Sequence, residues 1–511
     1  MRHLITGAAA FMLASTALAH TGHGDGEVTL SERVGTEYMV MQTSADQTAQ
    51  EPFLRGLALL HNFEYDRAAT AFREAQDADP DFVMAYWGEA MTHNHPLWEQ
   101  QDREAAREAL AKLGSAPADR AAKARNPREA EWLGAVEILY GEGTKEARDL
   151  AYLGHMRSMF AADPDDIDIR AFTGLAILGS SHGGRQIPIY MEAAGLLEPG
   201  FMTNEMHPGI LHYLIHSYDD PVHAPLGKRM AERYAVAAPD AGHAQHMVSH
   251  IFYALADWKA TEAANVRAAG VVNSQRIASG REATSCGHYN EWLAYSLLQQ
   301  GKDASDLIKS CHSQAAASIR KFEEGGRSDT SVLQGTWSAT RVANFLGVDG
   351  AEWIEPLELP AVPETFAARF QQEHGQLLKD RHDPVIVREK LNMLMQLRDE
   401  RLQYAREQDP DREPEFPVWA LRAIEQGNAL LLLAEGKREQ GLAKLEEAAA
   451  AELDLPIEFG PPPIFKPSYE ILGEELLDYG RREEAVEAFG KSLQLAPGRW
   501  RSLAGQATTL R

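Results

Sequence analysis

The stretch FLRGLALLHNFEYDRAATAFREAQDADP (residues 53–80) carries the residue pattern that decides the fold. Small residues at Gly56 and Ala68 allow two antiparallel helices to approach each other closely. Phe72 is placed to fill the gap between these helices, and Pro80 is placed to end the second one. The stretch therefore predicts one tightly packed pair of antiparallel helices.

The same spacing returns near the C-terminus. In PSYEILGEELLDYGRREEAVEAFGKSLQLAP (467–497), Gly473, Phe489 and Pro497 take the offsets of the first copy, and NALLLLAEGKREQGLAKLEEA (428–448) is a weaker copy. Agreement at several fixed offsets in distant parts of one chain indicates internal repeats. The pattern is typical of tetratricopeptide (TPR) repeats. It predicts an all-α fold, a TPR-type right-handed α-solenoid of antiparallel helix pairs.

Composition supports a folded helical protein and argues against two kinds of partner. The chain has 511 residues, of which 44% are hydrophobic, and its 75 acidic and 50 basic residues give a formal charge of −25. Such a surface should repel nucleic acid and anionic membranes, so we expect no nucleic-acid partner. Beyond the first residues no stretch is apolar enough for a membrane span.

The first residues, MRHLITGAAAFMLASTALA (1–19), read as a secretory signal peptide. Arg2 precedes a short apolar stretch, and small residues up to Ala19 fit a cleavage site, which predicts a periplasmic or secreted protein. An uncleaved anchor is the alternative. Export would allow Cys286 and Cys311 to form a disulfide, although two separate thiols fit the sequence equally well.

Breaks in the repeat pattern suggest how the chain is organised. Irregular structure is expected over 325–345, 350–364 and 460–467, and the last two of these segments are rich in proline. The predicted parts are a signal peptide (1–19), a flexible N-terminal segment (20–50), an N-terminal solenoid with a histidine-rich groove (51–349), a connecting region (350–415) and C-terminal TPR repeats (416–511).

Four blocks of the sequence resemble a known family. They are YWGEAMTHNHPLW, HYLIHSYDDP, HMVSHIFYALADW and GPPPIFKPSYEILGE, which together resemble blocks of a family of exported bacterial TPR proteins. The resemblance extends from about residue 51 to the C-terminus. It implies a TPR fold and export, and it implies no particular biochemical activity.

Histidines follow the repeat. His212 and His216 take the fifth and ninth positions of one repeat, and His246 and His250 take the same positions 34 residues later. Each pair shares a helix face, and first helices of adjacent repeats stack about 8–10 Å apart. The four imidazoles can therefore converge and hold zinc, copper or iron, with Asp219 or Asp220 completing the set or orienting a ring. A structural or peptide-binding polar network is the favoured alternative, and catalytic histidines are the least favoured.

Further polar and aromatic residues fall at positions that line the concave groove of a TPR protein. We expect these residues to hold a peptide, a partner protein or a small polar ligand: His61, Trp87, His95, Asp219, His243, Tyr253 and His288. For Trp87, plain packing between helices is the favoured alternative.

Enzyme signatures are missing from the sequence. It contains no H-E-x-x-H, no G-x-S-x-G and no phosphate-binding glycine motif. No catalytic residue is predicted, and an enzyme is the less favoured class. The sequence favours a binding or scaffold protein, and the alternative is a metal-binding protein or metalloenzyme that uses the paired H-x-x-x-H helices.

Overall fold

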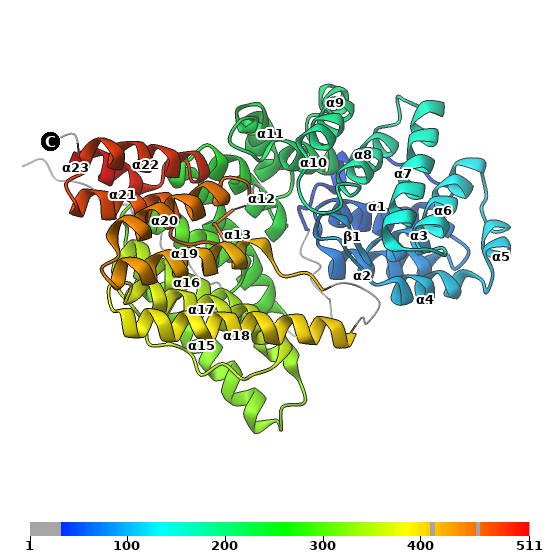
Figure 1. The fold of residues 1–511 in the computed structure, drawn as a ribbon. Coiled ribbons are helices and arrows are strands. Elements are labelled where there is room, and N and C mark those ends of the chain that lie inside the picture. The colour runs from blue at the N-terminus through cyan, green and yellow to red at the C-terminus, as the bar shows by residue number, and fades with distance from the viewer. Residues whose placement is uncertain (1–31, 409–413, 456–459, 510–511) are drawn as a thin grey trace, which may run out of the picture. The chain divides into compact units, whose positions relative to one another are not determined.

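The protein is described by a computed structural model that covers residues 32–408, 414–455 and 460–509. Within these residues the chain forms 23 α-helices, four short 3-10 helices and one hairpin of two-residue strands (Figure 1). None of the helices in this part of the chain has the length and apolar character needed to cross a membrane. The signal peptide expected over 1–19 lies outside the described residues.

The helices of the first half are α1 (Gln47–His61), α2 (Tyr65–Ala78), α3 (Val83–Met91), α4 (Arg103–Leu113), α5 (Pro117–Ala121), α6 (Pro127–Leu139), α7 (Lys145–Ala162), α8 (Ile167–Leu178), α9 (Ile187–Thr203), α10 (Pro208–Tyr218), α11 (Ala224–Ala237) and α12 (Gly242–Ala254). The strands β1 (Asn94–His95) and β2 (Gln100–Gln101) pair antiparallel, and the first two 3-10 helices are η1 (Thr36–Tyr38) and η2 (Pro96–Trp98).

The second half contains α13 (Trp258–Ala278), α14 (His288–Gln299), α15 (Ser305–Glu324), η3 (Thr330–Leu333), α16 (Gly335–Gly350), η4 (Pro363–Thr365), α17 (Phe366–Lys379), α18 (Pro384–Gln408), α19 (Val418–Ala434), α20 (Arg438–Glu452), α21 (Ser468–Asp478), α22 (Arg482–Leu495) and α23 (Trp500–Thr509). The expectation of irregular structure over 325–345 is wrong for its second part, because α16 begins at Gly335.

Helix pairs pack as the repeat spacing predicts. The Phe72 ring of α2 lies between Gly56 of α1 and Gly88 of α3, so close that a Cβ atom on these glycines would come within 2.8 and 2.4 Å of the ring. In the C-terminal copy, a Cβ atom on Gly473 of α21 would likewise lie 2.8 Å from the Phe489 ring of α22. The all-α TPR-type solenoid is confirmed.

The flexible N-terminal segment predicted over 20–50 is ordered in its described part, from residue 32 on, and residues 20–31 lie outside the described residues. Residues 33–46 lie against the helices, with Val34 and Met41 buried, and the Asn62 side chain donates to the Val34 carbonyl at 2.8 Å. α1 begins at Gln47 because the Asp46 side chain caps it, accepting from the Thr48 and Ala49 amides. The buried side chains of Val34 and Met41 and the Asp46 cap thus order a segment whose composition predicts flexibility.

Buried apolar residues form two clusters, and their division does not fall in the predicted connecting region. The first core runs from Val34 to Ala264 and the second from Cys286 to Phe489. Helices α17 and α18 lie inside the second core, to which they contribute residues such as Phe370. The prolines of 350–364 mark an irregular segment between α16 and α17 rather than a boundary between cores.

Candidate metal centre

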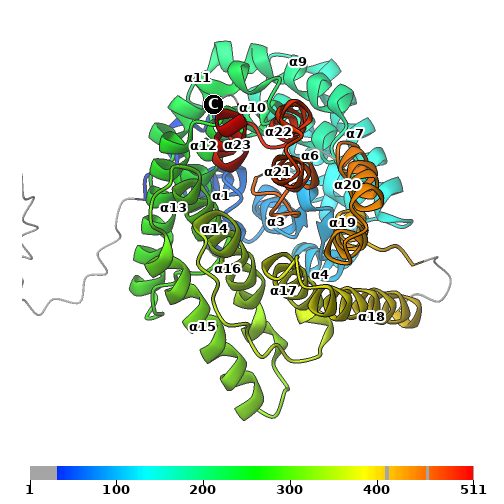
Figure 2. The same ribbon diagram turned by 60° about the vertical axis from the view of Figure 1, so that its left-hand side comes forward.

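Two neighbouring helices carry the periodic histidines. α10 contributes His212 and His216, and α12 contributes His243, His246 and His250. Figure 2 shows α10, α11 and α12 following one another, and α10 contacts α12 directly. All five imidazoles are buried. The repeat therefore places both histidine faces inside the protein, where contacts between rings replace contacts with solvent.

Three of these residues form the first histidine triad: His212, His216 and His243. One ring nitrogen from each lies within 4.8 Å of the other two. The ring centroids of His212 and His216 are 4.9 Å apart, and those of His212 and His243 are 5.1 Å apart.

Two ring nitrogens of the first triad are buried without a hydrogen-bond partner among the described residues. His212 Nδ1 lies 2.6 Å from the His61 carbonyl oxygen, which can only accept, so this nitrogen carries the proton and Nε2 carries the lone pair. The Nε2 atoms of His212 and His243 are buried without a hydrogen-bond partner among the described residues. A buried polar atom without a partner is unfavourable, and a bound cation would satisfy both atoms.

A second histidine triad lies beside the first and consists of His246, His250 and His288. Its ligand nitrogens also lie within 4.8 Å of one another. His246 and His250 are buried, whereas His288, the first residue of α14, is exposed. The second triad therefore has one ligand at the surface, unlike the first.

Asp219 connects the two triads. Its Oδ2 atom lies 2.9 Å from His250 Nδ1 and 3.4 Å from His216 Nδ1. Arg185 forms a buried ion pair with Asp219 and contacts Asp220 at 3.0 Å. Burial opposes ionisation of Asp219, but Arg185 and the two histidines outweigh it and hold the carboxyl pKa well below its usual range.

Burial keeps four of these histidines in the protonation state that binds metals, namely His212, His243, His246 and His250. Removal from water lowers the pKa values of His212, His243 and His246 well below the ordinary value, and the neighbouring histidines lower them further. Burial also lowers the pKa of His250 to about 4, against the opposing effect of Asp219. Neutral imidazole is the form that coordinates transition metals.

Aromatic side chains cover the first triad. The Phe63 ring centroid lies 4.3 Å from that of His212 and 5.5 Å from that of His243. The Trp98 ring, which is half exposed, lies 6.0 Å from the His243 ring. Phe63 has a φ of 56°, in the left-handed region that a bulky residue rarely adopts.

Another group of possible ligands contains His61, Asp168 and His207. Most of its nitrogens already have partners. His61 Nδ1 contacts the Tyr213 hydroxyl at 2.9 Å, and His207 Nδ1 accepts from the Ile210 amide at 3.3 Å, capping α10. His207 Nε2 lies 3.4 Å from Asp168. This group serves mainly as a hydrogen-bond network under the first triad.

The other residues expected in the groove have different surroundings. Trp87 has no exposed surface, and its ring packs 5.1 Å from Trp132, so it lies in the core and not on a groove wall. His95 is half-buried and stacks on Tyr65 at 4.0 Å. Tyr253 is half-buried beside Trp292. Packing, which the sequence favoured for Trp87, thus describes Trp87 and Tyr253, whereas His95 also lines a hollow of about 640 Å³ together with Tyr65 and His93.

The structure also divides the histidines differently from the sequence. The predicted set His212, His216, His246 and His250 is divided between the two triads, with His243 joining one and His288 the other. His216 and His250 also form a group of possible ligands with Asp219, as the sequence predicts for that carboxylate. Side chains three residues apart on a helix diverge by about 60°, so His243 faces α10 while His246 faces α14.

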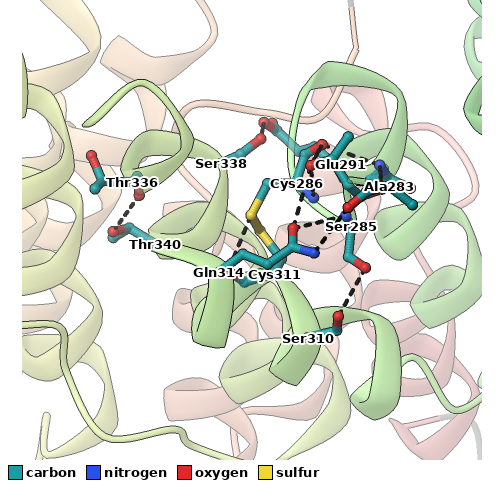
Figure 3. Close-up of a disulfide and its surroundings, with 12 residues drawn as sticks. Ala283, Ser285, Cys286, Glu291, Ser310, Cys311, Gln314, Thr336, Ser338 and Thr340 are labelled. Atoms are coloured by element: carbon teal, nitrogen blue, oxygen red, sulfur yellow. Dashed lines mark hydrogen bonds between the residues drawn. A yellow bond between two sulfur atoms is a disulfide. The ribbon is translucent and has the colours of Figure 1, made fainter. Parts of the chain in front are cut away.

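A disulfide braces the start of α14, where His288 lies. Cys286 and Cys311 are bonded, with Cα atoms 4.7 Å apart, which settles the choice that the sequence leaves open. Figure 3 shows the surrounding contacts: the Ser285 and Ser310 hydroxyls lie 2.9 Å apart, and the Gln314 side chain accepts from the Ser285 amide at 3.0 Å.

The fold and the site together define a class, the all-α TPR-type solenoid with a buried histidine cluster. No protein-family model matches the chain, and no curated protein sequence matches it. Similar solved structures include Cut9 in the APC/C Cut9–Hcn1 heterotetramer, with 11% identity, a TM-score of 0.35 and coverage of 91% of this chain and 76% of that one.

Two further structures have similar values. The human IFIT1 dimer with m7Gppp-AAAA has 13% identity, a TM-score of 0.34 and coverage of 94% of this chain and 93% of that one. Yeast Tom70 has 11% identity, a TM-score of 0.30 and coverage of 91% and 88%. None of the three is similar enough to transfer a function to this chain.

Proposed function

We propose that this protein binds a transition-metal ion through the first histidine triad, His212, His216 and His243. The observation that carries the proposal is the pair of buried Nε2 atoms, on His212 and His243, that have no hydrogen-bond partner among the described residues. A ring nitrogen buried in this way is a ready ligand, because no hydrogen bond has to be broken before a cation binds, and in His212 the Nε2 atom carries the lone pair.

The ligand set indicates the class of metal. Three neutral imidazoles suit zinc, copper or iron, at nitrogen–metal distances of about 2.0–2.1 Å for zinc. Nitrogens that lie within 4.8 Å of one another reach such distances after small side-chain movements. Asp219 and the His61 carbonyl would orient the rings from behind, as partners of ligating histidines do in known sites.

Zinc binding to the metal-depleted full chain tests the proposal. The bound metal would be measured by elemental analysis after addition of Zn²⁺ and gel filtration, with copper and iron salts tested in parallel. His243→Gln removes one ligand of the first triad. His374→Gln is the matched control, because His374 is equally buried but hydrogen-bonds to Gln426 in the second core.

We expect the wild type and His374→Gln to retain metal at this site and His243→Gln to lose it, with affinity reduced at least about 100-fold. Circular dichroism would verify that all three proteins are folded. Equal metal content and equal affinity in wild type and His243→Gln would overturn the proposal.

A second candidate function is binding of a polypeptide segment, which a hollow on the C-terminal repeats favours. The hollow has a volume of about 180 Å³ and lies between α20, α21 and α22. Its lining combines four carboxylates with two cationic and several apolar side chains: Glu439, Glu446, Glu484, Glu487, Arg481, Lys491, Leu442, Leu472, Leu476 and Tyr469. The excess of carboxylates suits a segment that carries lysine or arginine between apolar residues.

Fluorescence polarisation with a labelled lysine- and leucine-containing peptide tests this candidate. Glu446→Lys reverses one charge of the hollow, and Glu146→Lys, at an exposed position of α7, is the control. Weaker binding in Glu446→Lys alone supports the candidate. Equal binding by both variants and the wild type contradicts it.

An exported, oxidising location also belongs to the proposal. The disulfide between Cys286 and Cys311 supports it, because such bonds persist outside the reducing cytosol. We also propose that the protein belongs to the family of exported bacterial TPR proteins that its sequence resembles, which requires the same location. Cell fractionation of the source organism, with mass spectrometry of the N-terminus, tests both the location and the cleavage expected at about Ala19.

A further inference from the structure

The proton positions in the second histidine triad follow from its partners. The side-chain NH2 group of Asn265 donates a hydrogen bond to the Thr261 carbonyl oxygen at 2.9 Å. The side-chain oxygen of Asn265 therefore faces His246 Nδ1, at 2.7 Å. The reversed amide would set its oxygen against the Thr261 carbonyl oxygen. The amide oxygen can only accept, and therefore His246 Nδ1 carries the proton and Nε2 the lone pair.

The neighbouring ring is fixed in the same way. His250 Nδ1 lies 2.9 Å from Asp219 Oδ2, and the Arg185 ion pair keeps this carboxylate ionised. An ionised carboxylate only accepts hydrogen bonds, so His250 Nδ1 also carries the proton. The lone pair of His250 is thus on Nε2, as it is in His246.

This arrangement brings two lone pairs together. The Nε2 atoms of His246 and His250 are 3.1 Å apart. Two neutral imidazoles would repel each other here, because neither nitrogen has a proton to donate. Only a positive species between the two nitrogens relieves the repulsion, either a shared extra proton or a metal ion.

The third member of the triad decides between these two species. The His288 ring centroid lies 4.5 Å from that of His246, and its ligand nitrogen lies within 4.8 Å of the other two. A shared proton would need only two nitrogens, whereas a metal ion uses all three. A nitrogen–nitrogen separation near 3 Å is also what two ligands of one ion adopt at bond lengths of about 2.0–2.1 Å.

We propose that His246, His250 and His288 form a second metal site, coupled through Asp219 to the site of the first triad. The second site extends the proposed metal-binding function and rests on it. Asp219 orients a ligand of each site, His216 in one and His250 in the other. Asn265 is a positioning residue, because it fixes the His246 ring without touching the metal.

The test measures Zn²⁺ equivalents and affinities in the metal-depleted full chain, with a competing chelator. His288→Gln removes the exposed ligand of the second site, where a folding defect is least expected. His243→Gln removes a ligand of the first site, and His374→Gln again serves as the control. We expect two equivalents in the wild type and the control, and one in each of the two ligand variants.

The outcomes separate the two proposals. If His288→Gln binds as much zinc as the wild type, with equal affinity, the second site is overturned while the first stands. If His243→Gln alone is unchanged, the first site is overturned. Histidine-selective nitrogen NMR adds a second readout: a proton that remains between His246 and His250 after zinc loading would also overturn the second site.

Asn265→Leu probes the positioning role. Without Asn265 the His246 ring can carry its proton on Nε2 and donate it to His250, so zinc affinity at the second site should fall about 10–100-fold. Zinc affinity at the first site should stay unchanged. Asn265→Asp keeps an acceptor at this position and should restore binding. Equal loss in the Leu and Asp variants would contradict the assigned role.

Discussion

At the scale of single residues, Arg499 is the strongest individual constraint on the second core. It has no exposed side-chain surface, and it contacts Asp349 at 2.7 Å and Glu470 at 2.8 Å, both of which are also fully buried. Arg499 helps to hold the pKa of Glu470 at about 2 despite burial, which alone would raise it. Arg499 thus compensates two buried carboxylates at close range, and Lys466 adds a more distant contact to Glu470 at 3.7 Å.

Arg499→Met should therefore be severely destabilising. It would remove the only cation in direct contact with the Asp349 carboxylate among the described residues and leave Glu470 with the more distant Lys466, which lowers the free energy of unfolding by about 3–5 kcal/mol. Urea denaturation measures the change. The control is Arg481→Met, whose exposed pair with Glu484 should contribute little. Equal effects of the two substitutions would contradict the compensating role of Arg499.

Because of His374, the stability of the protein should fall as the pH is lowered. Burial lowers its pKa to about 4, against about 6.5 in an unfolded chain. As the pH falls below about 6.5, the unfolded state takes up a proton that the folded state refuses, so stability falls until the pH reaches about 4. Between pH 7 and pH 5 this residue should remove about 2 kcal/mol of stability.

The measurement compares unfolding free energies of the wild type and His374→Gln at these two pH values. The variant should lose about 2 kcal/mol less than the wild type on acidification, because its side chain does not titrate. An identical loss in both proteins would mean that His374 titrates with the same pKa in the folded and the unfolded state, so that burial does not lower it.

At the scale of helices, glycines act in opposite ways at packed and open positions. At Gly88 in α3 a Cβ atom would lie 2.4 Å from the Phe72 ring, whereas at Gly154 in α7 it would meet nothing within 4 Å. Gly88→Ala should lower the free energy of unfolding by about 1–3 kcal/mol through overpacking. Gly154→Ala should raise it by about 0.5–1 kcal/mol through helix propensity.

Chemical denaturation of the two alanine variants beside the wild type checks both signs. The pair is internally controlled, because the same substitution is made in both helices. A gain of stability at Gly88 would contradict the packing of Phe72 between neighbouring helices, and a loss at Gly154 would contradict the open surroundings of that position.

The pairing of helices and the placement of the histidines could be predicted from the sequence. Helix pairing follows from spacing along one hairpin, so the positions of Gly56 and Phe72 were enough to predict it. The 34-residue period also placed the histidines of α10 and α12 on adjoining faces. Which triad each histidine joins depends on the direction in which its side chain points from the helix. The spacing between repeats does not contain this information.

Residues that support the histidines were harder to find. Arg185 and Asn265 come from other parts of the solenoid and have no periodic signal, although both determine how the histidines are held. His207 lies in the histidine-rich run before His212, but it follows no repeat offset. Such partners are fixed by packing between repeats, which a single sequence does not reveal.

At the scale of the whole molecule, the described chain contains two apolar cores that succeed one another along the sequence. In a solenoid each repeat contacts mainly its neighbours, so a local loss of stability spreads only a short distance. The last ligand of the histidine cluster, His288, lies two residues after Cys286, the first residue of the second core.

Hydrogen exchange in Arg499→Met should reveal this separation. Amides of α14 to α23, in the second core, should exchange faster than in the wild type, while those of α1 to α11 should keep their rates. Mass spectrometry of peptic fragments measures both regions in one experiment. A uniform increase along the chain would mean that the two cores unfold together.

The order of the ligands along the chain fixes the order in which the cluster can be completed. A polypeptide emerges N-terminus first, so every residue of the first triad is available once His243 has appeared. The second triad must wait for His288, and its brace must wait longer still, for Cys311. At roughly 5–20 residues per second, this delay lasts several seconds. In every newly made molecule the first triad can therefore assemble several seconds before the second.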